Sequence, residues 1–245
     1  MRPYYDHAGI TIYNSDCRDI LPTLAPGSVD LVLTDPPYGE QTHAGARGGA
    51  GDSILVDFNA TSADELRNTM AALPSGRWWV SFMEWQHAAA LHRHPPLGWD
   101  FIRLGVWVKP NGAPQFTGDR PGMGYESIVT CWSGSGRSHW NGGGRHGVYQ
   151  FNTAMGGSGH QTEKPLDLIA ELVRLFSDPA DLILDPFMGS GTTLVAAKQL
   201  GRRAIGIEIE ERYCEIAVKR LAQSVMQFEP VAAEPDAALP LEALA

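Results

Sequence analysis

The stretch DLILDPFMGSGTTLVAA, residues 181–197, decides the expected fold because it joins a buried strand to a helix through a glycine-rich turn. The apolar run before Asp185 is short and continuous, as in central strands that are covered on both faces. Gly189 and Gly191 let the backbone pass close to a ligand. Thr192 opens the helix, whose first N–H groups are unpaired and carry partial positive charge. The stretch therefore predicts a strand, a turn and a helix that bind a cofactor.

The strand that follows this helix, AIGIEI, ends on Glu208, about 20 residues beyond the glycines. A carboxylate at this place can accept hydrogen bonds from ribose hydroxyls, so the unit indicates a cofactor that carries adenosine. The spacing is neither that of a Walker A loop nor GxGxxG. The alternative is a glycine-rich turn that serves packing alone, and the acidic end of the next strand argues against it.

The rest of the chain alternates between strand and helix patterns, which predicts an α/β domain with a parallel or mostly parallel sheet. The expected strands are residues 9–13, 29–35, 77–82, 101–109, 126–132, 181–187 and 203–209. In such sheets, ligands bind beyond the carboxyl ends of the strands. Long loops are expected at residues 39–53, 110–123 and 133–161, and the first two directly follow strand ends.

A second apolar run, in VDLVLTDPPY at residues 29–38, ends on Asp35, Pro36, Pro37 and Tyr38. Proline fixes its own φ and biases the preceding residue towards extended backbone. The carboxylate of Asp35 and the carbonyl of Pro36 are therefore preorganised hydrogen-bond acceptors. The alternative is a proline turn that only ends a strand, with Asp35 capping the loop.

Together these motifs resemble those of a known family. DPFMGSGTT resembles the S-adenosylmethionine motif of amino-directed DNA methyltransferases, and DPPY resembles their catalytic motif. NSDCRDIL, HQTEKP and GIEIEERYCEIA also resemble family segments, and a catalytic motif that precedes the cofactor motif is the order of the β group. The resemblance spans residues 12–221. It implies a Rossmann-like fold with a mostly parallel seven-stranded sheet, helices on both faces, and one methyltransferase domain at residues 1–228.

The resemblance also implies the chemistry of the site. The exocyclic amino group of adenine or cytosine is a poor nucleophile, because its lone pair is delocalised into the ring. Asp35 and the Pro36 carbonyl would accept its two N–H bonds and aim the nitrogen at the methyl group, with Pro37 fixing their geometry. Tyr38 offers a face on which a base can stack. A base in double-stranded DNA must be flipped out to reach this site. Neither a metal nor a covalent enzyme intermediate is required.

The cofactor implied by the resemblance is S-adenosylmethionine. Asp16 would contact its adenine amino group, although a helix N-cap explains this residue nearly as well. Thr162 and Lys164 would lie near its methionine end, the alternative being a helix start with a surface lysine. The expected cofactor-binding residues are Asp16, Thr162, Lys164, Asp185, Pro186, Phe187, Gly189, Ser190, Gly191, Thr192, Glu208 and Ile209.

DNA contacts are expected from two loops that contain long stretches without an acidic residue, at positions 41–51 and 133–162. Residues 39–53 would form a mobile loop over the flipped base, and residues 133–161 lie where β-group enzymes usually insert their recognition region. The expected DNA-binding residues are Arg47, Arg137, His139 and Arg145. The alternative is that acidic residues are absent by chance from flexible, glycine-rich loops.

Composition and residue spacing restrict the class of protein and the roles of its cysteines and tryptophans. The net charge of −9 is partly due to residues 229–245, an acidic tail that is expected to be disordered. No apolar run approaches the ~20 residues of a membrane span, and no secretory signal or metal-binding spacing is present. The three cysteines are assigned to structure, since none follows a proline as the cytosine-C5 nucleophile does. Trp107 resembles part of a family W-x-K segment but is equally explained by packing, and Trp78, Trp79, Trp85 and Trp99 are assigned to packing.

The sequence thus predicts a site-specific DNA methyltransferase in a bacterial or phage-encoded restriction-modification setting, cytoplasmic and associated with the nucleoid. DPPY favours adenine N6 over cytosine N4 as the methylated atom. Less favoured alternatives are an RNA or protein N-methyltransferase, which usually carries NPPY after the cofactor motif, and an inert DNA-binding homologue. The recognition sequence, a homodimer and a partner restriction enzyme are left open.

Overall fold

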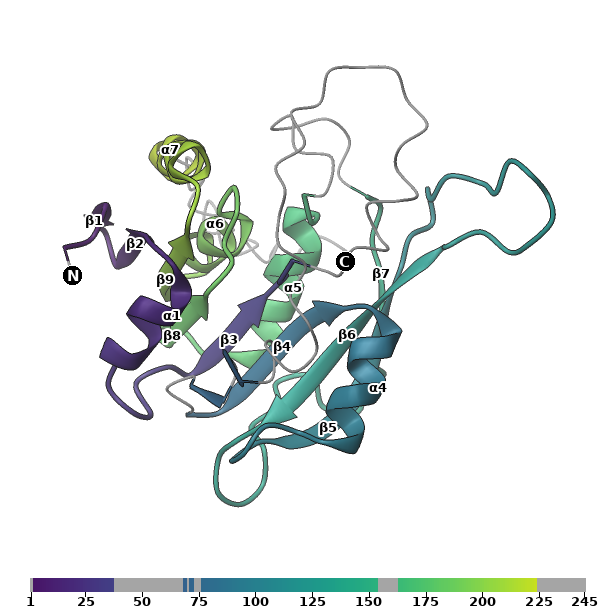
Figure 1. Ribbon diagram of the computed structural model, residues 1–245, viewed down its shortest axis with the longest axis horizontal. Coiled ribbons are helices and arrows are strands. Elements are labelled where there is room, and N and C mark those ends of the chain that lie inside the picture. Colours follow the sequence, from purple (N-terminus) through teal and green to yellow (C-terminus); the bar gives the residue numbers. More distant parts are fainter. Residues whose placement is uncertain (1, 38–67, 70, 73–75, 154–162, 224–245) are drawn as a thin grey trace, which may run out of the picture.

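A computed structural model describes residues 2–37, 68–69, 71–72, 76–153 and 163–223 and contains one nine-stranded sheet (Figure 1). The strand order is β1-β2-β9-β8-β3-β4-β6-β5-β7. The strands are β1 (Tyr5–His7), β2 (Ile10–Asn14), β3 (Leu31–Thr34), β4 (Trp78–Met83), β5 (Asp100–Val108), β6 (Tyr125–Trp132), β7 (Val148–Gln150), β8 (Leu182–Asp185) and β9 (Arg203–Glu208). The helices are α1 (Cys17–Ile20), the 3₁₀ turn η1 (Leu21–Thr23), α4 (Trp85–Arg93), α5 (Leu166–Phe176), α6 (Thr192–Gln199) and α7 (Glu211–Ala222).

The predicted α/β fold is confirmed, and all seven expected strands are present. The pairs β2–β9, β9–β8, β8–β3, β3–β4 and β5–β7 are parallel, whereas β6 runs antiparallel to both β4 and β5. The prediction of seven strands is corrected to nine by β1 and β7, which add short edges of three residues each. A segment of three residues is too short to show a periodic pattern.

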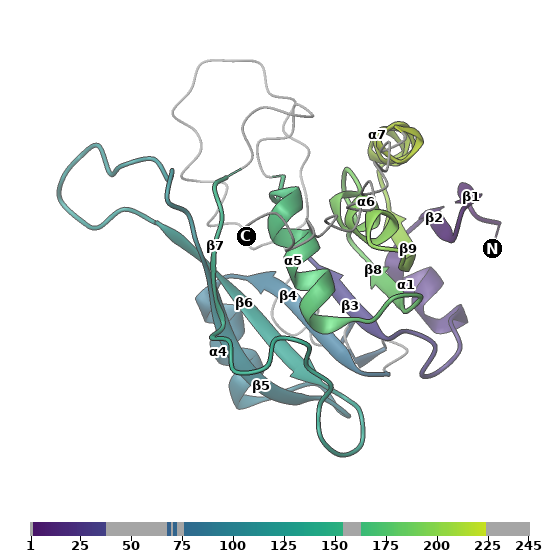
Figure 2. The ribbon, with the colours of Figure 1, turned by 180° about the vertical axis from the view of Figure 1, so that it is seen from behind.

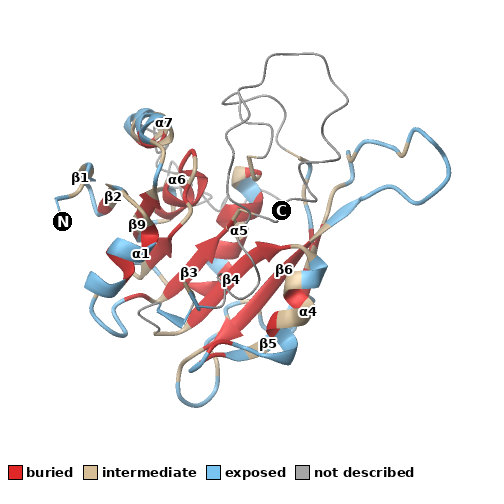
Figure 3. Ribbon diagram, in the orientation of Figure 1, coloured by how far each residue is buried: buried red, intermediate tan, exposed pale blue. Residues whose placement is uncertain are grey.

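Helices cover both faces of the sheet, because the central strands are apolar on both sides. On β3, Leu31 and Leu33 pack towards α5, α6 and α7, while Val32 packs towards α1, η1 and α4. The two layers are seen from opposite sides in Figures 1 and 2. The central strands are buried along most of their length (Figure 3). This arrangement leaves the ends of the strands as the places where a polar site can form.

Strand direction decides which loops meet at which edge. Strands β2, β9, β8, β3 and β4 are parallel neighbours, so their carboxyl ends share one edge, here called the carboxyl edge. The turn between β5 and β6 lies at the same edge, since Met83 at the end of β4 pairs with Ser127 near the start of β6. The other end of β6 lies at the opposite edge, because Trp132 pairs with Trp78, the first residue of β4.

Packing explains most of the tryptophans as predicted. Trp78, Trp79 and Trp99 are buried, and the indole N–H of buried Trp107 donates to the carbonyl of Phe151 at 2.7 Å. The assignment of Trp85 to packing is wrong, because this residue opens α4 at the carboxyl edge and its side chain is 60% exposed.

Several predictions fall on residues outside the described ranges: Tyr38, Arg47, Thr162, the loop of residues 39–53 and the tail of residues 229–245. Of the helices in the described part of the chain, none combines the length and hydropathy that a membrane span requires.

Candidate active site

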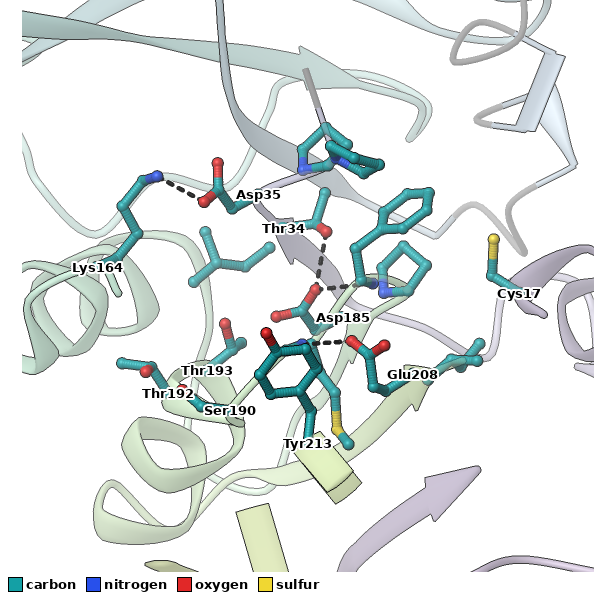
Figure 4. A pocket seen from close by; sticks show the side chains of 18 of the residues that line it. Cys17, Thr34, Asp35, Lys164, Asp185, Ser190, Thr192, Thr193, Glu208 and Tyr213 are labelled. Carbon is teal, nitrogen blue, oxygen red and sulfur yellow. Dashed lines mark hydrogen bonds and ion pairs between the residues drawn. The ribbon is translucent and has the colours of Figure 1, made fainter. Parts of the chain in front are cut away.

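A cavity of about 320 Å³ opens at the carboxyl edge, between the ends of β2, β3, β8 and β9 (Figure 4). Its volume is in the range of small-molecule sites. The predicted residues that line it are Asp16, Asp35, Pro36, Pro37, Lys164, Asp185, Pro186, Phe187, Gly189, Ser190, Thr192, Glu208 and Ile209. The fold thus brings the two motifs, which are about 150 residues apart in sequence, to one cavity.

Asp185 ends β8 and joins it to β3. Its Oδ1 accepts hydrogen bonds from the Thr34 hydroxyl at 2.8 Å and from the Phe187 N–H at 3.2 Å. Burial raises the pKa of Asp185 to about 6, although the hydrogen bonds from Thr193, Thr34 and Phe187 favour the carboxylate. Asp185 therefore fixes the turn after β8 and presents an incompletely solvated carboxyl group to the cavity.

Glu208, at the end of β9, is held by two backbone N–H groups. Gly189 donates to Oε2 at 3.0 Å and Glu210 donates to Oε1 at 2.9 Å. Burial raises the pKa of Glu208 despite these bonds. Gly189 and Gly191 have positive φ angles of 49° and 81°, and a Cβ on Gly191 would lie 2.7 Å from the Cβ of Ala217 on α7. The glycine turn thus requires these glycines and also orients the carboxylate that was predicted to bind ribose (Figure 4).

Arg220 on α7 stabilises the glycine turn through Ser190 and Thr192. Its NH1 donates to the Ser190 carbonyl at 2.9 Å, to the Ser190 hydroxyl at 2.8 Å and to the Thr192 hydroxyl at 3.1 Å. Its NH2 pairs with the Glu163 carboxylate at 2.6 Å, which also accepts from the Thr192 hydroxyl at 3.0 Å. Sequence reasoning did not single out Arg220 or Glu163. Glu163 lies inside HQTEKP, whereas Arg220 reads as an ordinary residue of an amphipathic helix.

Lys164 connects the HQTEKP segment to the catalytic motif. Its Nζ lies 2.5 Å from Oδ2 of Asp35 and 3.3 Å from Oε2 of Glu126, and 5.0 Å from the ring centroid of Phe82. The Lys164 side chain is only 10% exposed, which rules out the surface-lysine alternative. Pro36 is buried and Asp35 is half-buried beside it, at the rim of the cavity. Sequence reasoning missed Glu126, which lies within a strand pattern with no motif of its own.

Asp16 fits both of its interpretations. Its carboxylate caps α1 by accepting the Arg18 N–H at 2.8 Å, and the Arg18 side-chain hydrogen bond lowers the pKa of Asp16. The same side chain lines the cavity, next to Cys17. Capping is therefore confirmed, and contact with adenine stays a prediction.

Arg137, His139 and Arg145, which are predicted to contact DNA, lie in the segment that follows β6. The segment that carries them leaves β6 at the edge opposite to Asp35, because β6 runs antiparallel to β4. It then packs against α5 and the turn that follows. His139 Nε2 lies 2.9 Å from the carboxylate of Asp178, and Arg145 pairs with Glu171 on α5. These three residues therefore lie at the edge of the sheet opposite to the catalytic motif, and their contact with DNA stays a prediction.

The cysteines are buried thiols. Burial raises the pKa of Cys17 to about 11 and the pKa values of Cys131 and Cys214 to about 12, so the thiolate is scarce at neutral pH. Their assignment to structure agrees with this burial. Within the described ranges, no three His, Cys, Asp or Glu side chains gather as metal ligands would.

Comparison with known proteins agrees with this geometry. The model of the DNA methylase family matches residues 130–219. The Type II methyltransferase M.HinfI of Haemophilus influenzae is 29% identical, over 87% of this chain and 68% of the relative. The Type II methyltransferase M2.DpnII of Streptococcus pneumoniae is 28% identical, over 90% of this chain and 92% of the relative.

Solved structures of DNA methyltransferases are also similar to this chain. The M1.HpyAVI–SAM complex has a TM-score of 0.68 and 26% identity, over 87% of this chain and 99% of the other. TTHA0409 of Thermus thermophilus, a DNA modification methylase by its description, has a TM-score of 0.63 and 26% identity, over 89% and 96% of the two chains. The cytosine-N4-specific PvuII DNA methyltransferase, at 15% identity and a TM-score of 0.66, supports the fold alone. The chain is therefore similar to DNA methyltransferases in both sequence and fold.

Proposed function

We propose that this protein is a site-specific DNA methyltransferase that transfers a methyl group from S-adenosylmethionine to the N6 amino group of a flipped-out adenine. The observation that carries the proposal is the position of Asp35, a carboxylate at the rim of the cavity that also contains the glycine turn and Glu208. A hydrogen-bond acceptor for the amino group and a cofactor site are therefore next to each other. The match to the DNA methylase family model supports DNA as the substrate.

The residues of the cavity fit S-adenosylmethionine. Glu208, held by two backbone N–H groups, presents its carboxylate where ribose hydroxyls could donate to it. Asp16 could accept from the adenine amino group, and Phe187 and Ile209 offer apolar surface to the ring. When bound, this cofactor supplies a methyl group on a positively charged sulfur. The M1.HpyAVI and TTHA0409 structures, which are described as complexes with it, support the same cofactor.

The residues of this chain position the base. Asp35 and the Pro36 carbonyl accept the N–H bonds of the amino group and so hold the nitrogen in one orientation, which lowers the entropic barrier to transfer. The acceptors also stabilise the positive charge that develops on the nitrogen. Lys164 fixes the orientation of Asp35. Tyr38, which follows directly in the sequence, provides the surface on which the flipped base stacks.

DNA contact is proposed for the loop between β5 and β6, residues 109–124, in place of Arg137, His139 and Arg145. This loop leaves the sheet at the carboxyl edge and extends well beyond the strands (Figure 1). It carries Arg120 and an 87% exposed Phe116, which suit phosphate contact and base stacking or wedging. Arg47 in the loop of residues 39–53 is proposed as a further phosphate contact.

The proposed setting is a bacterial restriction-modification system, as the Type II names of the relatives suggest. We also propose a cytoplasmic location close to the nucleoid. We further propose a homodimer that acts on the two strands of one site. Sedimentation of the protein with and without duplex DNA tests the dimer.

The experiment that tests the function offers methyl-labelled S-adenosylmethionine with unmethylated duplex DNA, RNA and protein in parallel. The proposal predicts label in duplex DNA. Label that enters only RNA or protein, or no transfer despite cofactor binding, would contradict it.

A further inference from the structure

We propose that Glu126 is a positioning residue for methyl transfer: it holds the ammonium group of Lys164 against the carboxylate of Asp35. The inference rests on the proposed function, in which Asp35 accepts the amino group of the base. Lys109, Glu126, Lys164 and Asp35 form a row of alternating charges that starts at the end of β5 and ends at the catalytic motif. This set of four side chains is called the charge row below.

The distances in the charge row are those of direct ion pairs. Lys109 Nζ lies 2.5 Å from Glu126 Oε1, Lys164 Nζ lies 3.3 Å from Glu126 Oε2, and the same Nζ lies 2.5 Å from Asp35 Oδ2. Only 10% of the Lys164 side chain and 29% of the Glu126 side chain are exposed. Partly buried ion pairs are screened less by salt than surface pairs, so these contacts are able to fix side-chain orientation.

Glu126 is the one member of the charge row that lies within a strand. It belongs to β6, which pairs with β5 on one side and with β4 on the other, and its direct neighbours in the sheet include Trp107 and the Ser127–Met83 pair. Lys164 comes from the segment before α5 and reaches the row through a flexible four-carbon stem. The Glu126 carboxylate, which is on a strand of the sheet, therefore holds the Lys164 ammonium group in place together with the ring of Phe82.

Electrostatics keeps the row charged. Burial alone would lower the pKa of Lys164, but the carboxylates of Asp35 and Glu126 outweigh it and raise this pKa. Burial would likewise raise the pKa of Glu126, but Lys164 and Lys109 outweigh it and lower this pKa. If Glu126 loses its charge, Lys164 loses one of the two carboxylates that hold its ammonium group, and that group can move. Because a hydrogen-bond acceptor must be aimed to be effective in catalysis, Asp35 then loses part of its alignment.

The test uses the full chain with Glu126→Gln, which keeps the shape of the side chain. We expect kcat for DNA methylation to fall about 10- to 100-fold, with the KM for cofactor and DNA within about 2-fold of the wild type. Glu126→Asp keeps the charge at shorter reach and should recover part of the lost kcat; it also serves if the glutamine variant fails to fold. Asp6→Asn, an exposed carboxylate on the edge strand β1, is the matched control and should keep wild-type kcat.

A second readout does not depend on activity. The chain has four lysines, at positions 109, 164, 198 and 219, so the ammonium signals of ¹⁵N-lysine-labelled protein can be resolved by NMR and Lys164 assigned with Lys164→Arg. We expect the Lys164 ammonium signal to persist at neutral pH in the wild type and to be lost in Glu126→Gln, because its protons then exchange faster with water.

The outcomes separate the two proposals. A wild-type protein that methylates no DNA refutes the proposed function, while the NMR comparison still tests whether Glu126 holds Lys164. If the Lys164 signal is the same in both proteins, or if kcat of Glu126→Gln stays within about 2-fold of the wild type, the positioning role is overturned. A rise in KM that accounts for the whole loss of activity would also overturn it.

Discussion

Replacement of Asp185 by Asn tests how much the burial of the Asp185 carboxylate at the cofactor site destabilises the folded protein. An amide has nearly the shape of the carboxyl group and its oxygen can accept the same bonds from Thr34 and Phe187. The amide nitrogen can use the Thr193 hydroxyl that faces the wild-type carboxylate. The variant therefore removes a buried negative charge with little loss of hydrogen bonding.

The magnitude follows from the pKa. Burial raises the pKa of Asp185 from 3.8 to about 6. Since each pKa unit corresponds to about 1.4 kcal/mol, the ionised group destabilises the native state at neutral pH by up to about 3 kcal/mol. Between these two pKa values the native state binds more protons than the unfolded state, so this contribution makes the free energy of unfolding rise as the pH falls from about 6 to about 4. At neutral pH we expect Asp185→Asn to be the more stable protein.

The assay is urea unfolding of both proteins, followed by the fluorescence of the seven tryptophans, from about pH 7.5 to about pH 4.5. The stability advantage of the variant should be largest at the upper end and should shrink through the range in which Asp185 titrates. Both proteins contain the same other carboxylates, so the titration of those groups drops out of the difference between the two free energies of unfolding. A difference that does not vary with pH would refute the reasoning.

Three further predictions concern the site and its DNA. Asp35→Ala removes both acceptor oxygens of the side chain opposite Lys164, so kcat for methyl transfer should fall about 10²–10³-fold while calorimetry shows cofactor affinity within about 3-fold; a retained kcat would exclude the acceptor role. Glu208→Ala should raise the calorimetric Kd for S-adenosylmethionine about 10- to 100-fold, and an unchanged Kd would undo the ribose assignment. Arg120→Ala should weaken DNA binding and reduce the salt slope by about 1, whereas Arg137→Ala should change neither; the reverse result would return DNA recognition to residues 133–161.

The strands and the acidic strand ends could be predicted from the sequence because each leaves a local pattern. A continuous apolar run marks a strand buried on both faces, and Asp185 and Glu208 each follow such a run directly. Parallel pairing then places their carboxylates together without any further information. The fold class and most of the cofactor cavity therefore follow from residues that are close in sequence.

Contacts between distant residues could not be predicted in the same way. The Lys164–Asp35 pair joins residues 129 positions apart, and nothing in HQTEKP or DPPY specifies that partner. The position of Arg137 and His139 in the fold could not be predicted for a related reason. An acid-free loop can be recognised in the sequence, but its edge of the sheet depends on the direction of β6, which only the pairing with β4 reveals. The same reversal places the loop of residues 109–124 beside the catalytic motif.

The most direct test of the central claim is the identity of the modified nucleoside. Unmethylated duplex DNA is incubated with the protein and S-adenosylmethionine, digested to nucleosides and analysed by mass spectrometry, with Asp35→Ala as the matched control. The account predicts N6-methyladenine from the wild type and at most traces from the variant. N4-methylcytosine would keep the role of Asp35 and change the base. Methylation at cytosine C5, or equal product from both proteins, would contradict the account.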